Sequence, residues 1–196
     1  MDTKPKIYII DVTNRDGVQT SRICLSKLQK TMINLYLDEM GIFQSEFGFP
    51  VTRHETNYLN ANLELVKIGA LSPIRLGGWL RATKEDVKNA FKLVPHIKHL
   101  NLSISTSDQM IIHKFKGKLD HQSLIKEMGE AVKEAKKSGA ETIGVNAEDA
   151  SRTDINYMCD VIEEAVSAGA TTINIPDTVG YAMPEEYGSR MKYVLE

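Results

Sequence analysis

The stretch Asp11-Val-Thr-Asn-Arg15-Asp16-Gly17-Val-Gln19 places a guanidinium beside a carboxylate, in front of a glycine. It follows an apolar run, so we expect a loop at the end of a β-strand. Asp16 offers a hard oxygen ligand of the kind that Mg²⁺ or Mn²⁺ prefers. Arg15 can stabilise negative charge that develops on an oxygen near such an ion. The plain alternative is an Arg–Asp pair on the surface, and the dipeptide by itself favours that alternative.

Polar residues follow the end of nearly every predicted strand. They are Arg15, Asp16, Gln19, Glu46, Arg81, Ser105, Thr106, Asp108, Glu148, Asp149, Asp177 and Thr178. A ring of such residues at the carboxyl ends of parallel strands is how a TIM barrel builds its active site.

Two segments that resemble each other reveal the repeating unit that positions these residues. Residues 134–145 and 164–175 each contain the end of an amphipathic helix, a glycine and a short β-branched strand. Gly139 and Gly169 stand where a helix must stop, a place that favours glycine because it adopts the left-handed conformation cheaply. Their spacing of 30 residues suits one strand-plus-helix unit of a parallel sheet.

The same template fits six times along the chain. Strands are predicted at residues 6–12, 43–47, 74–76, 100–104, 142–145 and 172–175, and helices at 26–40, 54–68, 84–93, 122–138, 153–168 and from Pro184 onward. Six alternations indicate the α/β class. The first strand–helix loop has no glycine-rich phosphate fingerprint, which argues against a dinucleotide-binding sheet.

These features favour a TIM-type (β/α)8 barrel. A full barrel needs eight strands and about 250 residues. We therefore expect residues 1–196 to be a single domain, the N-terminal portion of an incomplete barrel with about six β/α units.

Composition narrows the choice of partners. Hydrophobic residues make up 42%, charged residues 26%, and the net charge is −2, which predicts no nucleic-acid or anionic-membrane partner. No apolar run approaches the roughly 20 residues of a membrane span, and the first residues do not resemble a signal peptide. We expect a cytoplasmic enzyme. Cys24 and Cys159 are predicted to lie on helices as small buried side chains.

The segment Asp11–Gln19 resembles the Asp-x-Thr-x-Arg-Asp-Gly-x-Gln signature of the DRE-TIM metallolyases. That family includes isopropylmalate, homocitrate, citramalate and Re-type citrate synthases, together with hydroxymethylglutaryl-CoA lyases. Four further segments resemble family motifs in the same order: residues 45–50 (Ser-Glu-Phe-Gly-Phe-Pro), 105–108, 146–154 and 173–181.

The resemblance implies a role for each residue of the site. Asp16 is then a metal ligand, Arg15 and Glu148 are catalytic, and Arg15 faces the substrate keto oxygen. Gln19, Glu46 and Thr178 line the oxo-acid site with Arg15. The implied cofactor is a divalent metal (Mg, Mn or Zn), and acetyl-CoA is the co-substrate that condenses with a 2-oxo acid.

The chain departs from the family in two respects. The family takes its remaining metal ligands from a His-x-His motif on the seventh strand, and none of the five histidines stands in such a motif. The acetyl-CoA base, which the family is thought to supply from beyond the barrel strands, is also absent. A complementary chain or a homo-oligomer is therefore expected as a partner.

The substrate stays open at this stage. Residues 146–154 and 173–181 look most like isopropylmalate synthases, whereas Gln19-Thr20-Ser21 departs from them. Homocitrate synthase or Re-type citrate synthase is the preferred interpretation, and Arg53, Arg75 or Arg81 either pairs with a second carboxylate of the oxo acid or lies on a loop surface. Gly144 stands where homocitrate enzymes place an arginine. The alternatives are a 2-isopropylmalate synthase, an acyl-CoA lyase and a non-catalytic half-barrel partner.

Overall fold

The computed structural model of the protein describes residues 6–196. Its strands are β1 (Ile10–Asp11), β2 (Gln44–Gly48), β3 (Arg75–Arg81), β4 (His99–Ser105), β5 (Thr142–Glu148) and β6 (Thr172–Asn174). Its α-helices are α1 (Lys27–Glu39), α2 (Arg53–Lys67), α3 (Lys84–Leu93), α4 (Asp108–Phe115), α5 (His121–Lys137), α6 (Ile155–Ala168) and α7 (Pro184–Leu195). Short 3-10 helices cover Gly17–Gln19 and Ala150–Arg152.

The strand order identifies the fold class. The strands are hydrogen-bonded in chain order from β1 to β6, and the pairs β1–β2, β2–β3 and β5–β6 are parallel. A doubly wound sheet would reverse its order at a switch point, whereas a TIM barrel keeps chain order with a helix after each strand. The described residues thus form an α/β, TIM-type barrel that is incomplete, which confirms the predicted fold class.

The chain divides into two compact units. The first contains the chain up to Trp79 together with Asn89–His99, and the second contains Leu80–Lys88 and Leu100–Glu196.

In the first unit, α1 begins where its sequence predicts. The Ser26 side chain accepts from the amide of Gln29, whose side chain in turn accepts from the amide of Ser26, so the first turn is capped at both donors. The helix ends before Gly41, which has a φ of +74°. Near its end Asp38 accepts from the amides of Ser72 and Ile74 at 3.0 and 2.9 Å, which ties the chain leading into β3 to this helix.

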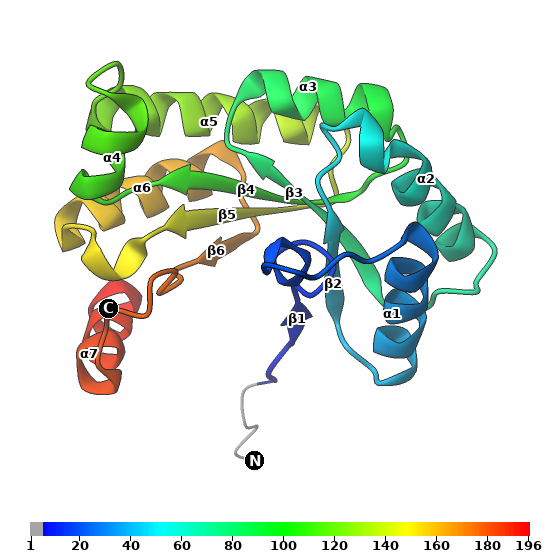
Figure 1. Cartoon of the computed structure of the whole chain (residues 1–196). Helices are drawn as coiled ribbons and strands as arrows, with labels where there is room; N and C mark the ends of the chain where they lie inside the picture. The colour runs from blue at the N-terminus through cyan, green and yellow to red at the C-terminus, as the bar shows by residue number, and fades with distance from the viewer. Residues whose placement is uncertain (1–5) are drawn as a thin grey trace, which may run out of the picture. The chain divides into compact units, whose positions relative to one another are not determined.

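In the second unit, β4, β5 and β6 end at the same side, as their arrowheads in Figure 1 show. Helices α5 and α6 bury one face each; the buried side chains of α6 are Tyr157, Met158, Val161, Ala165 and Ala168. Helix α6 starts at the Asp154 cap and stops at Gly169, whose φ is +111°. No helix in residues 6–196 is both long and apolar enough to cross a bilayer.

The first strand is shorter and less buried than expected. The sequence predicts a strand at residues 6–12, and an apolar run of this kind suits burial on both faces of a parallel sheet, yet Ile7, Tyr8 and Ile9 are 85%, 53% and 59% exposed. Strand β1 is hydrogen-bonded to β2 alone, so this prediction was wrong for the described part of the chain.

The third strand is longer than the predicted residues 74–76, because Gly77 and Gly78, which follow them, lie inside β3. A Cβ on Gly77 would stand 2.7 Å from Nε2 of Gln44, and one on Gly78 would stand 2.6 Å from Cδ1 of Ile97 and 2.8 Å from Cγ of Pro50. Glycine inside a strand often marks such a close approach. Gly78 is therefore a glycine for packing and not for a turn, whereas at Gly77 only the flexible end of the Gln44 side chain lies close.

Two further differences concern helices. The loop expected after β4 contains α4, whose first turn is capped by the Ser107 side chain accepting from the amide of Met110. Cys24 lies outside α1 and is exposed, because the helix does not begin until its cap at Ser26, whereas Cys159 is partly buried.

Candidate active site

A tight turn after β1 sets Arg15 and Asp16 side by side. The amides of Arg15, Asp16 and Gly17 all donate to the carbonyl oxygen of Val12, at 3.1, 2.8 and 3.2 Å. The turn leads directly into the 3-10 helix that ends at Gln19. The side chains of the motif therefore leave the backbone from defined positions.

The Arg15 guanidinium bridges two carboxylates. Its Nε and Nη2 atoms each lie 2.8 Å from Oε2 of Glu46, and its Nη1 lies 2.9 Å from Oδ1 of Asp16. The guanidinium carbon lies 5.1 Å from the ring centre of Trp79, a contact that attracts a cation to the ring face. A guanidinium carries more N–H donors than these contacts use, so Arg15 retains donors for a ligand.

Burial separates the two carboxylates. The side chain of Glu46 is 1% exposed and that of Asp16 is 61% exposed. The β2–β3 register shifts between Glu46 and Gly48, and such bulges redirect side chains beside active sites. Glu46 thus holds the guanidinium from the interior, while Asp16 presents a carboxylate to solvent.

Asp16 fits a divalent ion as one oxygen ligand. In the described part of the chain, no three His, Cys, Asp or Glu side chains gather closely enough to hold an ion. Mg²⁺ and Mn²⁺ prefer several oxygen ligands. An ion at Asp16 would therefore take its other ligands from substrate, water or further polypeptide.

A buried polar network supports the turn. Asn14 is fully buried and donates from Nδ2 to the carbonyl of Lys30 and to Oδ1 of Asn34, both at 2.8 Å. Asn34 donates to the Tyr58 hydroxyl at 3.0 Å, and burial raises the pKa of Tyr58. Among described residues, Oδ1 of Asn14 is a buried side-chain oxygen without a partner.

In the second unit, Glu148 lies at the end of β5 beside the end of β4. Its Oε2 accepts from Oγ of Ser105 at 2.6 Å and from Nζ of Lys114 at 2.7 Å. The Lys114 ammonium also donates to Oγ of Ser105 at 2.8 Å. The three side chains form a closed triangle, and the Glu148 side chain remains 30% exposed.

The loop after β5 is held by Asp149. This residue adopts the left-handed conformation, with φ +65° and ψ +37°, which L-residues seldom occupy. Its buried carboxylate accepts from Oγ of Ser107 at 2.5 Å and from Nη2 of Arg152 at 2.6 Å. Burial raises the pKa of Asp149, but hydrogen bonds from Arg152 and Ser107 outweigh it and hold that pKa below its ordinary range.

Thr178 closes over the same loop. Its hydroxyl oxygen accepts from the Asp149 amide at 3.0 Å. The neighbouring Asp177 accepts from Oγ of Ser151 at 2.5 Å and from the amide of Ala182 at 2.9 Å. Hydrogen bonds from Ser151 and from backbone amides lower the pKa of Asp177.

The structure therefore groups the predicted residues in two sets. Arg15, Asp16 and Glu46 are in direct contact in the first unit. Glu148 and Thr178 both adjoin Asp149 in the second, without a hydrogen bond between them among the described contacts. Gln19 belongs to the turn after β1, and its side chain is exposed.

Sequence reasoning missed Lys114 and Trp79. Both fell in segments that were interpreted as loops, and both contact a predicted catalytic side chain. The Ser107-Asp108 pair, an N-cap followed by an acidic first-turn residue, was the signal that a helix carries Lys114.

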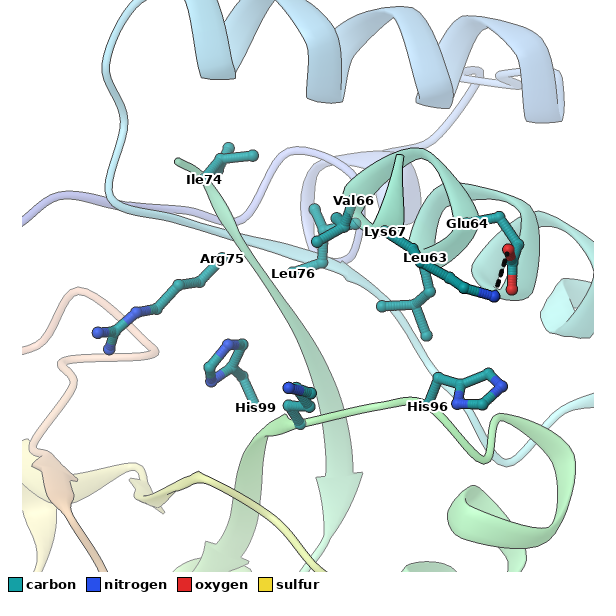
Figure 2. Close-up of a pocket in the computed structure, with 10 residues that line it drawn as sticks. Leu63, Glu64, Val66, Lys67, Ile74, Arg75, Leu76, His96 and His99 are labelled. Carbon is teal, nitrogen blue, oxygen red and sulfur yellow. Dashed lines mark hydrogen bonds and ion pairs between the residues drawn. The ribbon is translucent and has the colours of Figure 1, made fainter. Parts of the chain in front are cut away.

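Two of the candidate arginines have other partners. Arg81 donates from Nε and Nη2 to the carboxylate of Asp86, both at 2.7 Å. Arg75 begins β3 and lies 4.5 Å from the ring centre of Phe43. It also lines a cavity of about 300 Å³ whose other walls include Leu63 of α2 and His99 of β4 (Figure 2). This cavity is at the amino ends of the strands, so it does not include the predicted site residues.

Known proteins resemble this chain over nearly its whole length. The HMGL-like family model matches residues 6–196. A citrate (Re)-synthase of Dehalococcoides mccartyi (strain CBDB1) is 59% identical over 179 residues, which cover 91% of this chain and 43% of that protein. A 2-isopropylmalate synthase of Carboxydothermus hydrogenoformans is 37% identical over 198 residues, which cover 97% of this chain and 36% of that protein. The chain thus spans less than half the length of these curated relatives.

Solved structures support the fold. A hydroxymethylglutaryl-CoA lyase from Pseudomonas aeruginosa matches with a TM-score of 0.75 at 13% identity, over 96% of this chain and 63% of that one. An HMG-CoA lyase from Brucella melitensis matches with a TM-score of 0.73 at 17% identity, over 96% and 67% of the two chains. At such identities the likeness concerns the fold alone.

Proposed function

Because the chain belongs to the HMGL-like family, we propose that it provides the oxo-acid-binding part of an acetyl-CoA-dependent synthase of the Re-citrate type. In this reaction acetyl-CoA, oxaloacetate and water yield citrate and free CoA. The observation that carries the proposal is the identity of 59% to a citrate (Re)-synthase, over nearly the whole chain.

The geometry at Arg15 supports a condensation at a keto group. A divalent ion bound at Asp16 would polarise the keto oxygen as a Lewis acid. Arg15, held by Glu46 and Asp16, directs its remaining N–H donors at the oxygen that gains negative charge. Glu46 keeps the guanidinium in this orientation, since two of its N–H groups meet one buried carboxylate oxygen.

Glu148 and Thr178 have the second set of roles. Glu148 is partly exposed, and its carboxylate can take a proton from the ligand or accept a hydrogen bond from a ligand hydroxyl. Thr178 is exposed and its hydroxyl oxygen is oriented by the Asp149 amide, which fits an oxo-acid contact. Gln19 joins them as a substrate-binding residue.

The proposal includes a protein partner that contacts α1. Four large side chains of α1 and its C-cap, which we call the α1 stripe, are exposed: Leu28 (69%), Met32 (41%), Tyr36 (56%) and Met40 (71%). Their i, i+4 spacing puts them on one face of the helix. An exposed apolar stripe fits a protein surface that becomes covered, and we propose that further polypeptide of the synthase covers it.

The test is an assay of thiol release by the enzyme isolated from its native host. Oxaloacetate, 2-oxoglutarate and 2-oxoisovalerate are each supplied with acetyl-CoA, before and after removal of metal with EDTA. We expect release with oxaloacetate, its loss on chelation and its return with Mn²⁺ or Mg²⁺. Preference for 2-oxoisovalerate would mean an isopropylmalate synthase, and no release with any acid would end the synthase proposal.

The Asp16→Asn variant tests in the same assay whether Asp16 binds the metal. An amide is a neutral and poorer ligand for a hard cation, so we expect metal-dependent turnover to fall at least about 100-fold, as for other lost electrostatic contacts to a transition state. Asp160→Asn, at an exposed position of α6, is the matched control. Wild-type turnover by the Asp16 variant would remove this residue from the metal site.

A further inference from the structure

The triangle of Ser105, Lys114 and Glu148 leaves the Glu148 carboxylate with two unlike oxygens. Oε2 accepts two short hydrogen bonds, from Ser105 at 2.6 Å and from Lys114 at 2.7 Å. No described residue is hydrogen-bonded to Oε1. One oxygen is thus anchored to protein and the other is presented outward.

Helix α4 brings Lys114 to this position. The helix starts at the Ser107 cap and ends at Lys116, which adopts the left-handed conformation with φ +52°. Lys114 therefore lies in the last turn, where the helix dipole favours a cation. The side chain of Ser107 also donates to Asp149, the residue after Glu148, so the start of α4 is joined to the loop that follows β5.

The contacts of Lys114 restrict how Glu148 can turn. A carboxylate with one free oxygen and two donors on the other cannot rotate about its last bond without breaking both contacts. The ammonium donates to Glu148 and to Ser105 at once, so Ser105 and Lys114 also hold each other. A charge-assisted contact of this kind is stronger than a neutral one.

We propose that Lys114 is a positioning residue for the condensation: it anchors Oε2 of Glu148 so that Oε1 is the oxygen presented to the reacting ligand. This inference rests on the proposed function, because it assigns Lys114 a role through the catalytic residue Glu148. The rival view is a solvated ion pair, since the Lys114 side chain is 46% exposed and exposed pairs contribute little.

A double-mutant cycle on turnover separates the two views. In the enzyme from its native host, Lys114→Met should lower kcat roughly 10- to 100-fold, the range expected for a lost hydrogen bond to a charged group. The KM for the oxo acid should change little, because Lys114 does not touch the ligand. In a Glu148→Gln background the same substitution should change kcat less than about threefold, since its target is gone.

Three companion measurements keep the result interpretable. Lys114→Arg retains a cation and should recover most of the lost kcat. Lys118→Met removes a nearby exposed lysine and should leave kcat unchanged. Urea midpoints of all variants should match wild type, which excludes unfolding as the cause.

The outcomes separate this inference from the function on which it depends. Normal wild-type turnover with equal losses from Lys114→Met in both backgrounds would overturn the positioning role and leave the synthase intact. An unchanged kcat for Lys114→Met would do the same. Absence of thiol release by the wild-type enzyme would overturn the proposed function, and the role of Lys114 with it.

Discussion

At the scale of single residues, the two carboxylates that contact Arg15 have different roles because they are buried to different extents. Glu46 is enclosed and its Oε2 is committed to Arg15, whereas Asp16 is exposed and shares the same guanidinium. Arg15 is thereby held between a buried carboxylate and a solvent-facing one. A guanidinium suits this position because it is planar and meets two acceptors at fixed angles.

Arg15→Lys should therefore lower kcat with oxaloacetate about 10²–10³-fold, because an ammonium cannot contact Glu46 and Asp16 and also reach the keto oxygen. Arg75→Lys, at the amino end of β3, is the matched control and should have near wild-type kcat. Steady-state kinetics of both variants check this. A loss of less than tenfold for Arg15→Lys would argue against a role at the developing oxyanion.

At the scale of secondary-structure elements, close packing decides features that a pattern of residue types leaves ambiguous. Gly77 and Gly78 follow the predicted third strand in sequence, yet they lie inside β3, where the Pro50 ring and Ile97 occupy the space that a side chain on Gly78 would need. Helix α4 was likewise not predicted, because its segment has no clear pattern of polar and apolar residues. Both elements matter for the site, since one carries Trp79 to Arg15 and the other carries Lys114 to Glu148.

Gly78→Val tests the close packing directly. The added Cβ would meet the Pro50 ring at 2.8 Å, and overpacking of this kind costs about 1–3 kcal/mol. Urea unfolding should show a lower midpoint. Gly188→Ala on α7, where the added Cβ would meet no atom within 4 Å beyond its chain neighbours and the backbone of its own helix, should instead leave the midpoint unchanged or raise it. Equal midpoints for the two variants would contradict the packing argument.

At the scale of the whole molecule, the apolar surface that the first unit exposes supports the proposed contact with a partner. The chain covers 43% of a citrate (Re)-synthase and 36% of an isopropylmalate synthase. The α1 stripe and the side chains of Ile7, Tyr8 and Ile9 are exposed apolar surface of the first unit. Covering such surface removes apolar area from water, which is the main favourable term in association.

Met32→Lys with Tyr36→Lys should therefore abolish recovery of the proposed partner when the tagged chain is purified from its native host. Asn57→Lys with Ala61→Lys adds the same charge to exposed positions of α2 and should leave recovery intact. Mass spectrometry and light scattering identify the partner as a second polypeptide or a second copy. Equal recovery with both double variants would show that the α1 stripe is not the contact.

The residue pattern was sufficient to predict the alternation of strands and helices, the helix stops at Gly139 and Gly169, and the family motif around Arg15. These depend on local physics: glycines tolerate positive φ, and burial of one face imposes a helical or strand period. The strand order does not follow from this repetition alone, because a doubly wound sheet repeats the same unit; the ring of polar residues at the strand ends favoured the barrel.

Tertiary structure was needed for everything that depends on neighbours far away in the sequence. The pairing of Arg15 with Glu46 joins residues 31 positions apart, and that of Lys114 with Glu148 joins residues 34 apart. The exposure of the first apolar run and the interior place of Gly78 depend on which chain segments lie beside them. Periodicity reports which face of an element is apolar, and only packing determines what that face meets.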